Sequence, residues 1–428
     1  MLFRSNQTGE TLDRVVFYAM PNMLRRQNAL MYEAEDLEAL FPTGYAPGGI
    51  DLRSVKVNGA DAEYGFQGED ELYLRVACDL GPGESAVFEF DYYLLLSRCN
   101  AFIGAGDTDV RLKAFYFIPG AWDSYGHEFV LKKPLPFTRW LYCDAADFQV
   151  KLTLPAGYIA ASTGIAEGDS LVAENVREFA LAFGKRYRVH ERETDGGVKV
   201  RVFSGSRSAG RVAEAAAHAV EQCEAWFGEY PVRELDIAQS DYPLGALNAP
   251  GIILLPGRLM GEAGEMSLRF CAAQQIFGLC AYPEPSADAW LSDSVSSYVS
   301  YLMLEDEKGR DAFLSAINRD WVSALQLTIP GGLTVTSDAS LFTAQHYDIV
   351  ILRRGAVVLH ELRVAMGLDE LLAGLAGFVR MGESGATLTE MDFVHAMDAA
   401  SGRSWEAFLT DWAFNVDQYV NQQIDWYE

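Results

Sequence analysis

The stretch from Leu268 to Tyr301 constrains the fold most, because it predicts two helices in close succession. Its first half repeats apolar residues at the spacing of one helix face, and Pro283 and Pro285 then interrupt that pattern, because proline is poorly tolerated inside a helix. A second helical pattern begins near Asp288. The residues that these patterns are expected to bury are Phe270, Ala273, Ile276, Phe277, Trp290, Leu291, Val295, Tyr298 and Leu302.

Length, composition and charge limit the class of protein and of partner. The chain has 428 residues, 50% of them hydrophobic, so two or three domains with large cores are expected. Its formal net charge of -26 argues against binding to nucleic acid or to anionic lipid, because both require clustered Lys and Arg. No apolar run reaches the roughly eighteen residues of a membrane-spanning helix, and no basic-then-apolar leader is visible. The sequence specifies no cellular compartment.

The first part of the chain predicts strands. Short alternating runs at residues 15–20, 52–57, 71–77, 86–96, 148–154 and 177–183 are separated by turn signals such as Asn58-Gly59. Near residues 194–197 the pattern changes to a strand, a helix from about Ser208 to Phe227 and a further strand. We therefore expect an α+β chain with an all-β domain at 1–192 and a second domain at 193–428. The second domain divides into a sheet part at 193–260 and a helical part at 261–428.

Two segments of the helix pair resemble the signatures of a peptidase family. Residues 270–278 read F-C-A-A-Q-Q-I-F-G and residues 290–296 read W-L-S-D-S-V-S. They resemble the motifs H-E-x-x-H-x-W-F-G and W-L-N-E-G-F-A of the metallo-aminopeptidases related to membrane alanyl aminopeptidase and leukotriene hydrolase, which are gluzincins. Eighteen residues separate Gln274 from Asp293, as between the second His and the Glu ligand of that family. The resemblance implies a saddle-like β-sandwich followed by a thermolysin-like domain of mixed α/β and helical structure.

The same resemblance shows which chemistry is missing. In the family, two His and one Glu bind zinc, and another Glu acts as the general base. Phe270 and Gln274 stand at the His positions, Asp293 at the Glu ligand and Cys271 at the base. A phenyl ring cannot bind zinc. Zinc also favours His, Cys and carboxylate ligands over a neutral amide such as that of Gln274. We therefore expect no metal site and no cofactor, although zinc is the family's cofactor.

Three further segments resemble parts of the family. Gly245–Gly251 resembles an edge strand whose Glu grips the amino terminus of a peptide, and Asn248 stands at that Glu. In the β-rich part, Phe115–Pro119 resembles an aromatic strand and Ala146–Gly164 the hairpin that follows it. An amide cannot pair ionically with an ammonium group, so recognition of an amino terminus is expected to be impaired.

A later helix, at residues 347–367, resembles a family helix with the motif Y-x-K-G. The tyrosine of that motif stabilises the oxyanion of the tetrahedral intermediate. Matching the Lys-Gly pair to Arg354-Gly355 puts Leu352 at the tyrosine, and leucine has no donor. Tyr347 lies five residues earlier, where some relatives hold a second tyrosine, and is a candidate to reach the pocket.

The resemblance leaves three interpretations of function. The favoured one is a degenerate aminopeptidase-like protein, whose cleft is reused to bind a peptide or protein partner or for assembly. The alternative is an active metal-dependent peptidase or hydrolase with a rebuilt site, its metal on Asp293, Gln274 and a water. A third, compatible with the first, is the soluble part of a membrane-linked assembly, anchored through a segment absent from this chain. We expect no catalytic residue among the degenerate positions Phe270, Cys271, Gln274, Asp293 and Leu352, and expect binding through Asn248, Gln274, Asp293 and Tyr347. Phe270 and Leu352 are expected to make the cleft less polar, with Phe270 filling the metal's place.

Other catalytic motifs find no support. His360-Glu361 begins an H-E-x-x-H pattern, but Val364 stands at the second His, so the metal would lose a ligand. The six His residues are scattered, and each is expected to be a surface or core residue. The six Cys residues show no metal-binding spacing, and Cys271 is expected to pack rather than react. Neither a G-x-S-x-G elbow nor a phosphate-binding loop occurs.

Overall fold

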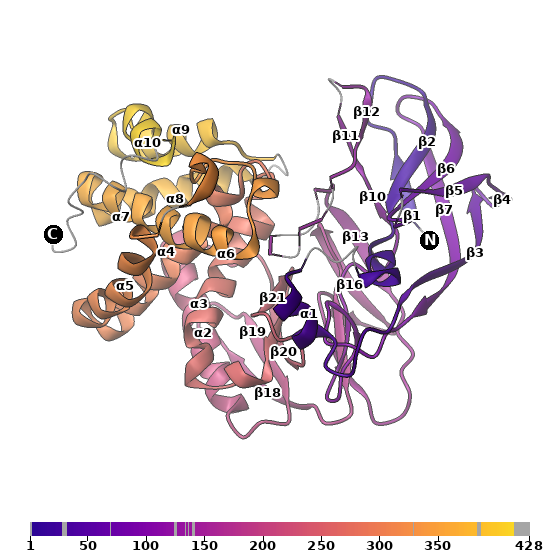
Figure 1. Cartoon of the computed structure of the whole chain (residues 1–428), viewed down its shortest axis with the longest axis horizontal. Coiled ribbons are helices and arrows are strands. Elements are labelled where there is room, and N and C mark those ends of the chain that lie inside the picture. Colours follow the sequence, from indigo (N-terminus) through magenta and orange to yellow (C-terminus); the bar gives the residue numbers. More distant parts are fainter. Residues whose placement is uncertain are drawn as a thin grey trace. The chain divides into compact units, whose positions relative to one another are not determined.

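The computed structural model describes residues 2–27, 32–68, 70–123, 126–132, 134–135, 137–138, 142–327, 329–382 and 387–414. Strands dominate its first part, and helices dominate from residue 265 onward (Figure 1). This confirms the α+β class and the order of sheet-rich and helical regions. The described residues form two compact units. Unit 1 contains those of 1–134, 141–185 and 240–244, and unit 2 contains those of 135–140, 186–239 and 245–428.

Unit 1 begins with two antiparallel four-stranded sheets that share one core. The first has the order β1 (Leu2–Ser5), β7 (Ser85–Leu95), β3 (Gly49–Val57), β4 (Ala60–Asp61), and the second β10 (Ile118–Pro119), β2 (Leu12–Tyr18), β6 (Tyr73–Leu80), β5 (Tyr64–Gln67). The rings of Phe17 from β2 and Phe88 from β7 lie 5.2 Å apart, and both side chains are fully buried. The predicted Asn58-Gly59 turn joins β3 to β4 with φ of 51° and 81°, the left-handed values that Asn and Gly tolerate best.

Two more sheets complete most of unit 1, and they overturn the expected hairpin at Ala146–Gly164. They have the orders β13 (Ala146–Val150), β16 (Ser170–Val176), β15 (Ile165–Glu167) and β14 (Ile159–Ser162), β17 (Leu181–Gly184), β9 (Val110–Leu112), β8 (Ile103–Ala105). β13 pairs with β16, whereas β14 pairs with β17, so the two expected hairpin strands belong to different sheets. The physical reason is burial, because Phe148 and Leu181 from the two sheets join one apolar cluster. The remaining elements of this unit are η1 (Met20–Arg25), α1 (Ala34–Leu40), β11 (Ala121–Asp123) and β12 (Glu128–Val130).

Unit 2 contains a five-stranded sheet beside α2 (Ala209–Phe227). The strand order is β18 (Arg188–Glu193), β19 (Lys199–Ser204), β20 (Glu234–Ser240), β22 (Ile252–Pro256), β21 (Leu247–Ala249). β19 and β20 are parallel, and α2 forms the crossover between them. The helix ends at Phe227, as predicted, and Gly228 caps it with a φ of 94°. β21 is an edge strand of this sheet, as expected. The expected domain boundary at 192 falls within β18.

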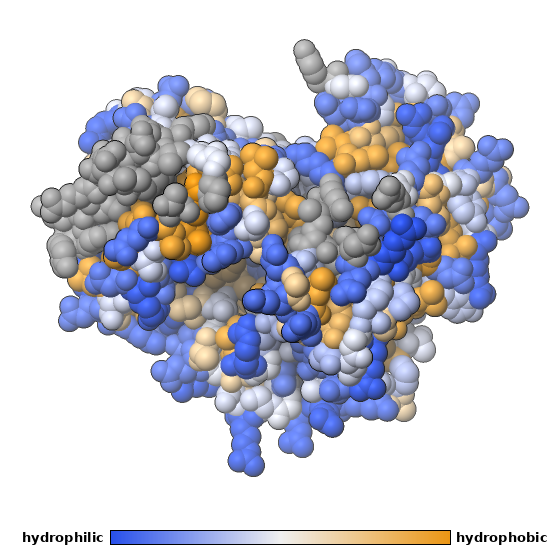
Figure 2. Space-filling model, in the orientation of Figure 1, coloured by the Kyte–Doolittle hydropathy of each residue, from blue (hydrophilic) through white to orange (hydrophobic). Residues whose placement is uncertain are grey.

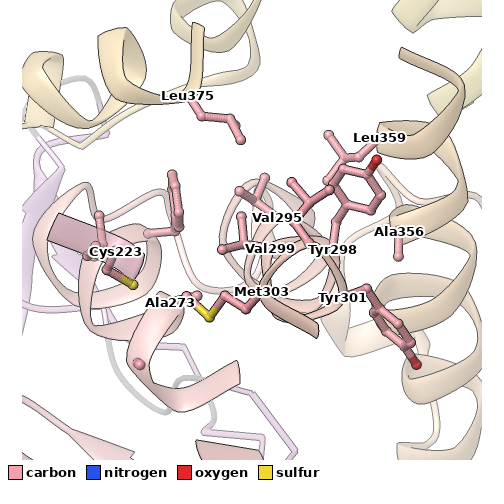
Figure 3. Packing of buried hydrophobic residues seen from close by; sticks show 14 of the residues in the cluster. Cys223, Ala273, Val295, Tyr298, Val299, Tyr301, Met303, Ala356, Leu359 and Leu375 are labelled. Atoms are coloured by element: carbon pink, nitrogen blue, oxygen red, sulfur yellow. The ribbon is translucent and has the colours of Figure 1, made fainter. Parts of the chain in front are cut away.

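The helices of unit 2 surround α4 (Ala289–Lys308). Every residue of α4 from Ala289 to Leu304 is buried, so this helix lies in the interior with neighbours on all sides. Figure 3 shows Val295, Val299 and Met303 of α4 among side chains from neighbouring elements. The other elements are η3 (Gly257–Leu259), η4 (Glu262–Gly264), α3 (Glu265–Gln274), η5 (Gln275–Cys280), α5 (Arg310–Leu325), η6 (Pro330–Gly332), η7 (Ala339–Leu341), α6 (Ala344–Tyr347), η8 (Asp348–Arg354), α7 (Gly355–Met366), α8 (Leu368–Gly382), α9 (Glu390–Ser401) and α10 (Glu406–Phe414).

Small residues let the helices approach α4 closely. A Cβ atom on Gly355 would lie 2.0 Å from Oγ of Ser294, so only glycine fits where α7 meets α4. Ser294 also donates a hydrogen bond of 2.6 Å to the carbonyl of Ile351 in η8. His360 of α7 is a buried core residue, as expected of a lone histidine, with its Nδ1 3.3 Å from the hydroxyl of Tyr298.

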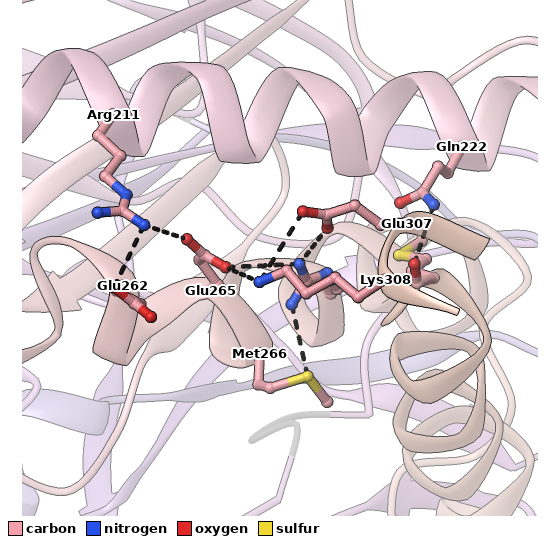
Figure 4. A network of polar contacts seen from close by, with 9 residues as sticks. Arg211, Gln222, Glu262, Glu265, Met266, Glu307 and Lys308 are labelled. Carbon is pink, nitrogen blue, oxygen red and sulfur yellow. Dashed lines mark hydrogen bonds and ion pairs between the residues drawn. The ribbon is translucent and has the colours of Figure 1, made fainter. Parts of the chain in front are cut away.

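A network of ion pairs ties α2, α3 and α4 together at their polar ends. Arg211 of α2 and Lys308 of α4 both pair with Glu265 of α3, at 3.4 and 2.8 Å (Figure 4). Arg269 of α3 pairs with Glu307 of α4. These contacts fix the start of α3 against the end of α4, which sets the register of the two helices along each other.

Figure 2 shows hydrophilic residues over much of one face of the molecule, with groups of hydrophobic residues between them. Among the helices of the described residues, none combines the length and the apolar character needed to cross a bilayer.

Candidate functional site

The packing of α3 against α4 brings Gln274 and Asp293 into direct contact. Nε2 of Gln274 donates a hydrogen bond of 2.9 Å to Oδ1 of Asp293. Both side chains are buried, with relative exposures of 7% and 4%. The eighteen-residue spacing therefore places these two positions face to face, as the resemblance implied.

Two more side chains donate to the carboxylate of Asp293. The hydroxyl of Ser292 donates a hydrogen bond of 2.8 Å to Oδ1, and the hydroxyl of Tyr347 donates one of 2.6 Å to Oδ2. The ring of Tyr347 packs against Phe137 with the centroids 5.2 Å apart. Hydrogen bonds thus engage both oxygens of this buried carboxylate, which reduces the free-energy cost of keeping a charge out of water.

Asn248 on the edge strand β21 extends the contact from the helices to the sheet. Its Nδ2 donates two hydrogen bonds of 3.1 Å, one to Oε1 of Gln274 and one to the carbonyl of Cys271. Its Oδ1 accepts a 2.6 Å hydrogen bond from Nε2 of Gln275. All four predicted binding residues, Asn248, Gln274, Asp293 and Tyr347, therefore belong to one hydrogen-bonded cluster, which we call the amide–carboxylate cluster together with Ser292 and Gln275.

The side chains at the other degenerate positions, Phe270, Cys271 and Leu352, lie outside this cluster, although the backbone carbonyl of Cys271 accepts from Asn248. Phe270 is half-buried and packs against the core of unit 2, and Leu352 is half-buried within η8. Cys271 is 2% exposed, and burial raises the pKa of its thiol to about 12. A thiol with that pKa is almost entirely protonated at neutral pH, so it is a poor nucleophile and a poor base.

The donor set does not fit zinc. The described residues contain no group of three or more His, Cys, Asp or Glu side chains placed to hold a metal. At the place where the family binds zinc, the cluster offers one carboxylate, hydroxyls and amides, whereas zinc prefers imidazole, thiolate and several anionic ligands. The expectation that apolar packing by Phe270 would fill this place is wrong, because hydrogen-bonded polar side chains meet there instead.

Two π-helical segments, η5 and η8, begin directly after cluster residues. η5 starts at Gln275, and η8 starts one residue after Tyr347. Such segments widen the helix by one residue per turn and are frequent at functional sites. The hydroxyl of Tyr347, just before η8, reaches Asp293, whereas Leu352 at the family's tyrosine position lies half-buried within η8.

Gln275 is a member of the cluster that the sequence analysis did not identify. It is 1% exposed, and its side chain also binds the backbone of β21 and of the following turn. The signal available was the pair Gln274-Gln275 inside an otherwise apolar helix, where two consecutive amides need buried partners.

Comparison with solved structures identifies the architecture. The M1 zinc metallopeptidase from Deinococcus radiodurans superposes with a TM-score of 0.66 at 19% identity, covering 95% of this chain and 87% of that one. A mutant of that enzyme bound to a Tyr-Ser-Ala substrate gives a TM-score of 0.64 at 19% identity, covering 96% and 88% of the two chains. No protein-family model matches the chain, and no curated protein matches it. From β1 to α10, this chain therefore has the fold of the M1 zinc metallopeptidases.

Proposed function

We propose that this protein is a catalytically degenerate aminopeptidase-like protein that uses the edge strand β21 and the adjoining amide–carboxylate cluster for binding. One observation carries the proposal: Nε2 of Gln274 lies against Oδ1 of Asp293, where a zinc peptidase needs a metal ion between its ligands. Without the metal, no water is activated and no carbonyl is polarised. The buried, protonated thiol of Cys271 supplies no substitute base.

The partner that suits an edge strand best is a peptide or an extended segment of a protein. β21 ends its sheet among the described strands, and an edge strand offers backbone donors and acceptors to an added strand. The cluster lies beside β21 through Asn248, so a peptide on that edge would pass its polar groups. The solved relative with a bound Tyr-Ser-Ala supplies a probe for this site.

The alternative is an active peptidase with a rebuilt, metal-dependent site. Its basis is the likeness to zinc peptidases and the presence of Tyr347 within hydrogen-bonding distance of Asp293. A tyrosine in such a position could donate to an oxyanion. This alternative requires a metal that Asp293 and Gln274 would have to hold.

One experiment separates the two functions. Amino-acid amides and Tyr-Ser-Ala are incubated with the purified protein, with zinc or with a chelator, beside the Asp293→Ala variant. The proposal expects no turnover under any condition. Turnover that survives repurification, stops on chelation and is lost in Asp293→Ala would establish the alternative.

Binding is then measured by calorimetric titration with Tyr-Ser-Ala. The proposal expects binding that a chelator does not change and that Asn248→Ala weakens by about tenfold, because that variant releases Gln274 and removes the link to β21. Asn318→Ala, at an exposed position of α5, is the matched control and should bind like wild type. Equal affinity of Asn248→Ala and wild type would place the peptide elsewhere.

A further inference from the structure

The orientation of the Gln275 amide is fixed by backbone groups. The N–H of Gly251 donates a hydrogen bond of 3.0 Å to Oε1 of Gln275, and Nε2 of Gln275 donates one of 3.0 Å to the carbonyl of Ala249. A backbone N–H can only donate and a carbonyl can only accept. Although the two ends of an amide have similar shapes, only one orientation satisfies both backbone groups of Gln275.

This fixed orientation, together with the carbonyl of Cys271, determines the next two amides in turn. Nε2 of Gln275 also donates to Asn248, so the atom of Asn248 that receives it must be Oδ1. Nδ2 of Asn248 then points to the carbonyl of Cys271 and to Oε1 of Gln274. Gln274 is left with its N–H facing Asp293, and all three amides donate in the direction of the carboxylate.

We propose that this chain of amides makes the zinc position of the fold a cation-excluding site, with Gln275 as the residue that sets its polarity. A metal ion between Gln274 and Asp293 would need the amide oxygen of Gln274, because an amide N–H repels cations. Turning Gln274 would set its Nε2 against Nδ2 of Asn248, and its Oε1 against the carboxylate. Turning Asn248 as well would set its Oδ1 against the carbonyl of Cys271 and its Nδ2 against Nε2 of Gln275.

The N–H of Gln274 therefore stabilises the carboxylate of Asp293. In a zinc peptidase, the metal ion stabilises the corresponding carboxylate. In a buried setting, aligned hydrogen bonds polarise one another and strengthen the last one, which faces the anion. This inference concerns cations only, so it holds or fails independently of whether a peptide binds along β21.

The first test replaces a single group. Gln274→Glu exchanges the N–H that faces Asp293 for an oxygen and creates two adjacent carboxylates, a ligand pair that suits Ca²⁺ or Mg²⁺. Thermal melts at pH 8, with and without millimolar CaCl₂, are expected to show no Ca²⁺ response in wild type. Gln274→Glu is expected to melt at least about 2 °C higher with Ca²⁺ than without it. Gln274→Glu with Asp293→Asn is the matched control, since it has only one of the two carboxylates, and should lose the response.

The second test addresses the relay from Gln275. Gln275→Glu cannot donate to Asn248 when ionised and instead favours Nδ2 of Asn248, against the preference set by the Cys271 carbonyl. Bound Ca²⁺ is then expected to decide the balance, so that Asn248 and Gln274 turn and Oε1 of Gln274 faces the cation and Asp293. This variant should gain a Ca²⁺ response that disappears when Asp293→Asn is added. A purely structural role of Gln275 would lower the melting temperature without creating that response.

Three results would overturn the proposal in whole or in part. Stabilisation of wild type by Ca²⁺ or Zn²⁺ that Asp293→Asn abolishes would show that the site accepts cations. Folded Gln274→Glu and Gln275→Glu variants without any Ca²⁺ response would show that amide polarity does not exclude them. A response in Gln274→Glu alone would overturn the role of Gln275. Should Gln274→Glu fail to fold, Asn248→Asp replaces it, since it removes the donor that holds Gln274 and is expected to gain the same response.

Discussion

The hydroxyl of Tyr347 donates a 2.6 Å hydrogen bond to Oδ2 of Asp293, across 54 positions of the sequence. The two residues belong to α6 and α4, and the bond closes the cluster on the side opposite Gln274. Phe137 and Phe342 flank the tyrosine ring, with centroid distances of 5.2 and 6.0 Å. Tyr347 therefore binds a buried carboxylate through its hydroxyl and packs against two phenylalanine rings.

Replacing Tyr347 by phenylalanine is expected to destabilise the protein by about 1.5–3 kcal/mol, because a hydrogen bond to a buried charged acceptor is lost while the ring remains. The measurement is the free energy of unfolding from urea titrations. Tyr93→Phe, at a side chain that is 52% exposed, is the control and should change the free energy little. A Tyr347→Phe variant as stable as wild type would show that this bond contributes nothing.

Cys271 is expected to resist alkylation in the native protein. Burial raises the pKa of its thiol to about 12, so almost no thiolate is present at pH 8 and reagents have little access. Iodoacetamide labelling followed by peptide mass spectrometry measures this directly, with a urea-unfolded sample as the control for reactivity. Rapid labelling of Cys271 in the native state would instead favour a functional thiol.

Acid is expected to weaken the contact of α4 with α7 through Glu305. Burial alone would raise the pKa of Glu305, but the hydrogen bonds and charges of Arg363 and Arg310 outweigh it and hold the pKa below the usual 4.5. A carboxyl group whose pKa is lowered on folding stabilises the protein above its unfolded pKa, and that stability is lost as the pH falls through the folded value.

The corresponding measurement is the urea midpoint between about pH 7 and pH 3. Glu305→Gln should lower the midpoint at pH 7 and reduce its fall below about pH 4.5. Glu63→Gln, at an exposed position of unit 1, should leave the profile unchanged. An identical acid profile of Glu305→Gln and wild type would contradict the assignment.

Much of the fold follows from local patterns. The helix pair, the cap at Gly228 and the capping box of Thr389 with Asp392 depend on residues close in sequence, and the structure has each of them. The prediction of a hairpin at Ala146–Gly164 was wrong, because its two strands pair with other strands in different sheets. That pairing depends on burial between sheets and is not visible in a local sequence pattern. The assignment of residue 135 to unit 2, where Leu135 joins the core, was equally beyond a segment-by-segment analysis.

Four of the six members of the candidate site were predicted, whereas Ser292, Gln275 and the hydrogen bonds that join the members were not. The spacing of Gln274 and Asp293 placed them together because two adjacent antiparallel helices transmit spacing reliably. Tyr347 contacts Asp293 across 54 positions of the sequence, and Gln275 binds the backbone of β21. Neither contact is visible in local side-chain patterns. The expected apolar filling failed because the buried carboxylate of Asp293 demands donors, and nearby amides and hydroxyls supply them.

The most direct test restores the family's ligands in the triple variant Phe270→His, Cys271→Glu, Gln274→His. Without metal, this variant should melt below wild type, because it loses the Gln274–Asp293 bond and buries imidazoles without partners. Zinc should recover part of the loss by binding only the folded state. Wild type, melted with and without zinc in the same experiment, is expected to show no change. Stabilisation of wild type by zinc, abolished by Asp293→Ala, would contradict the proposal that this protein binds no zinc at the family's metal position.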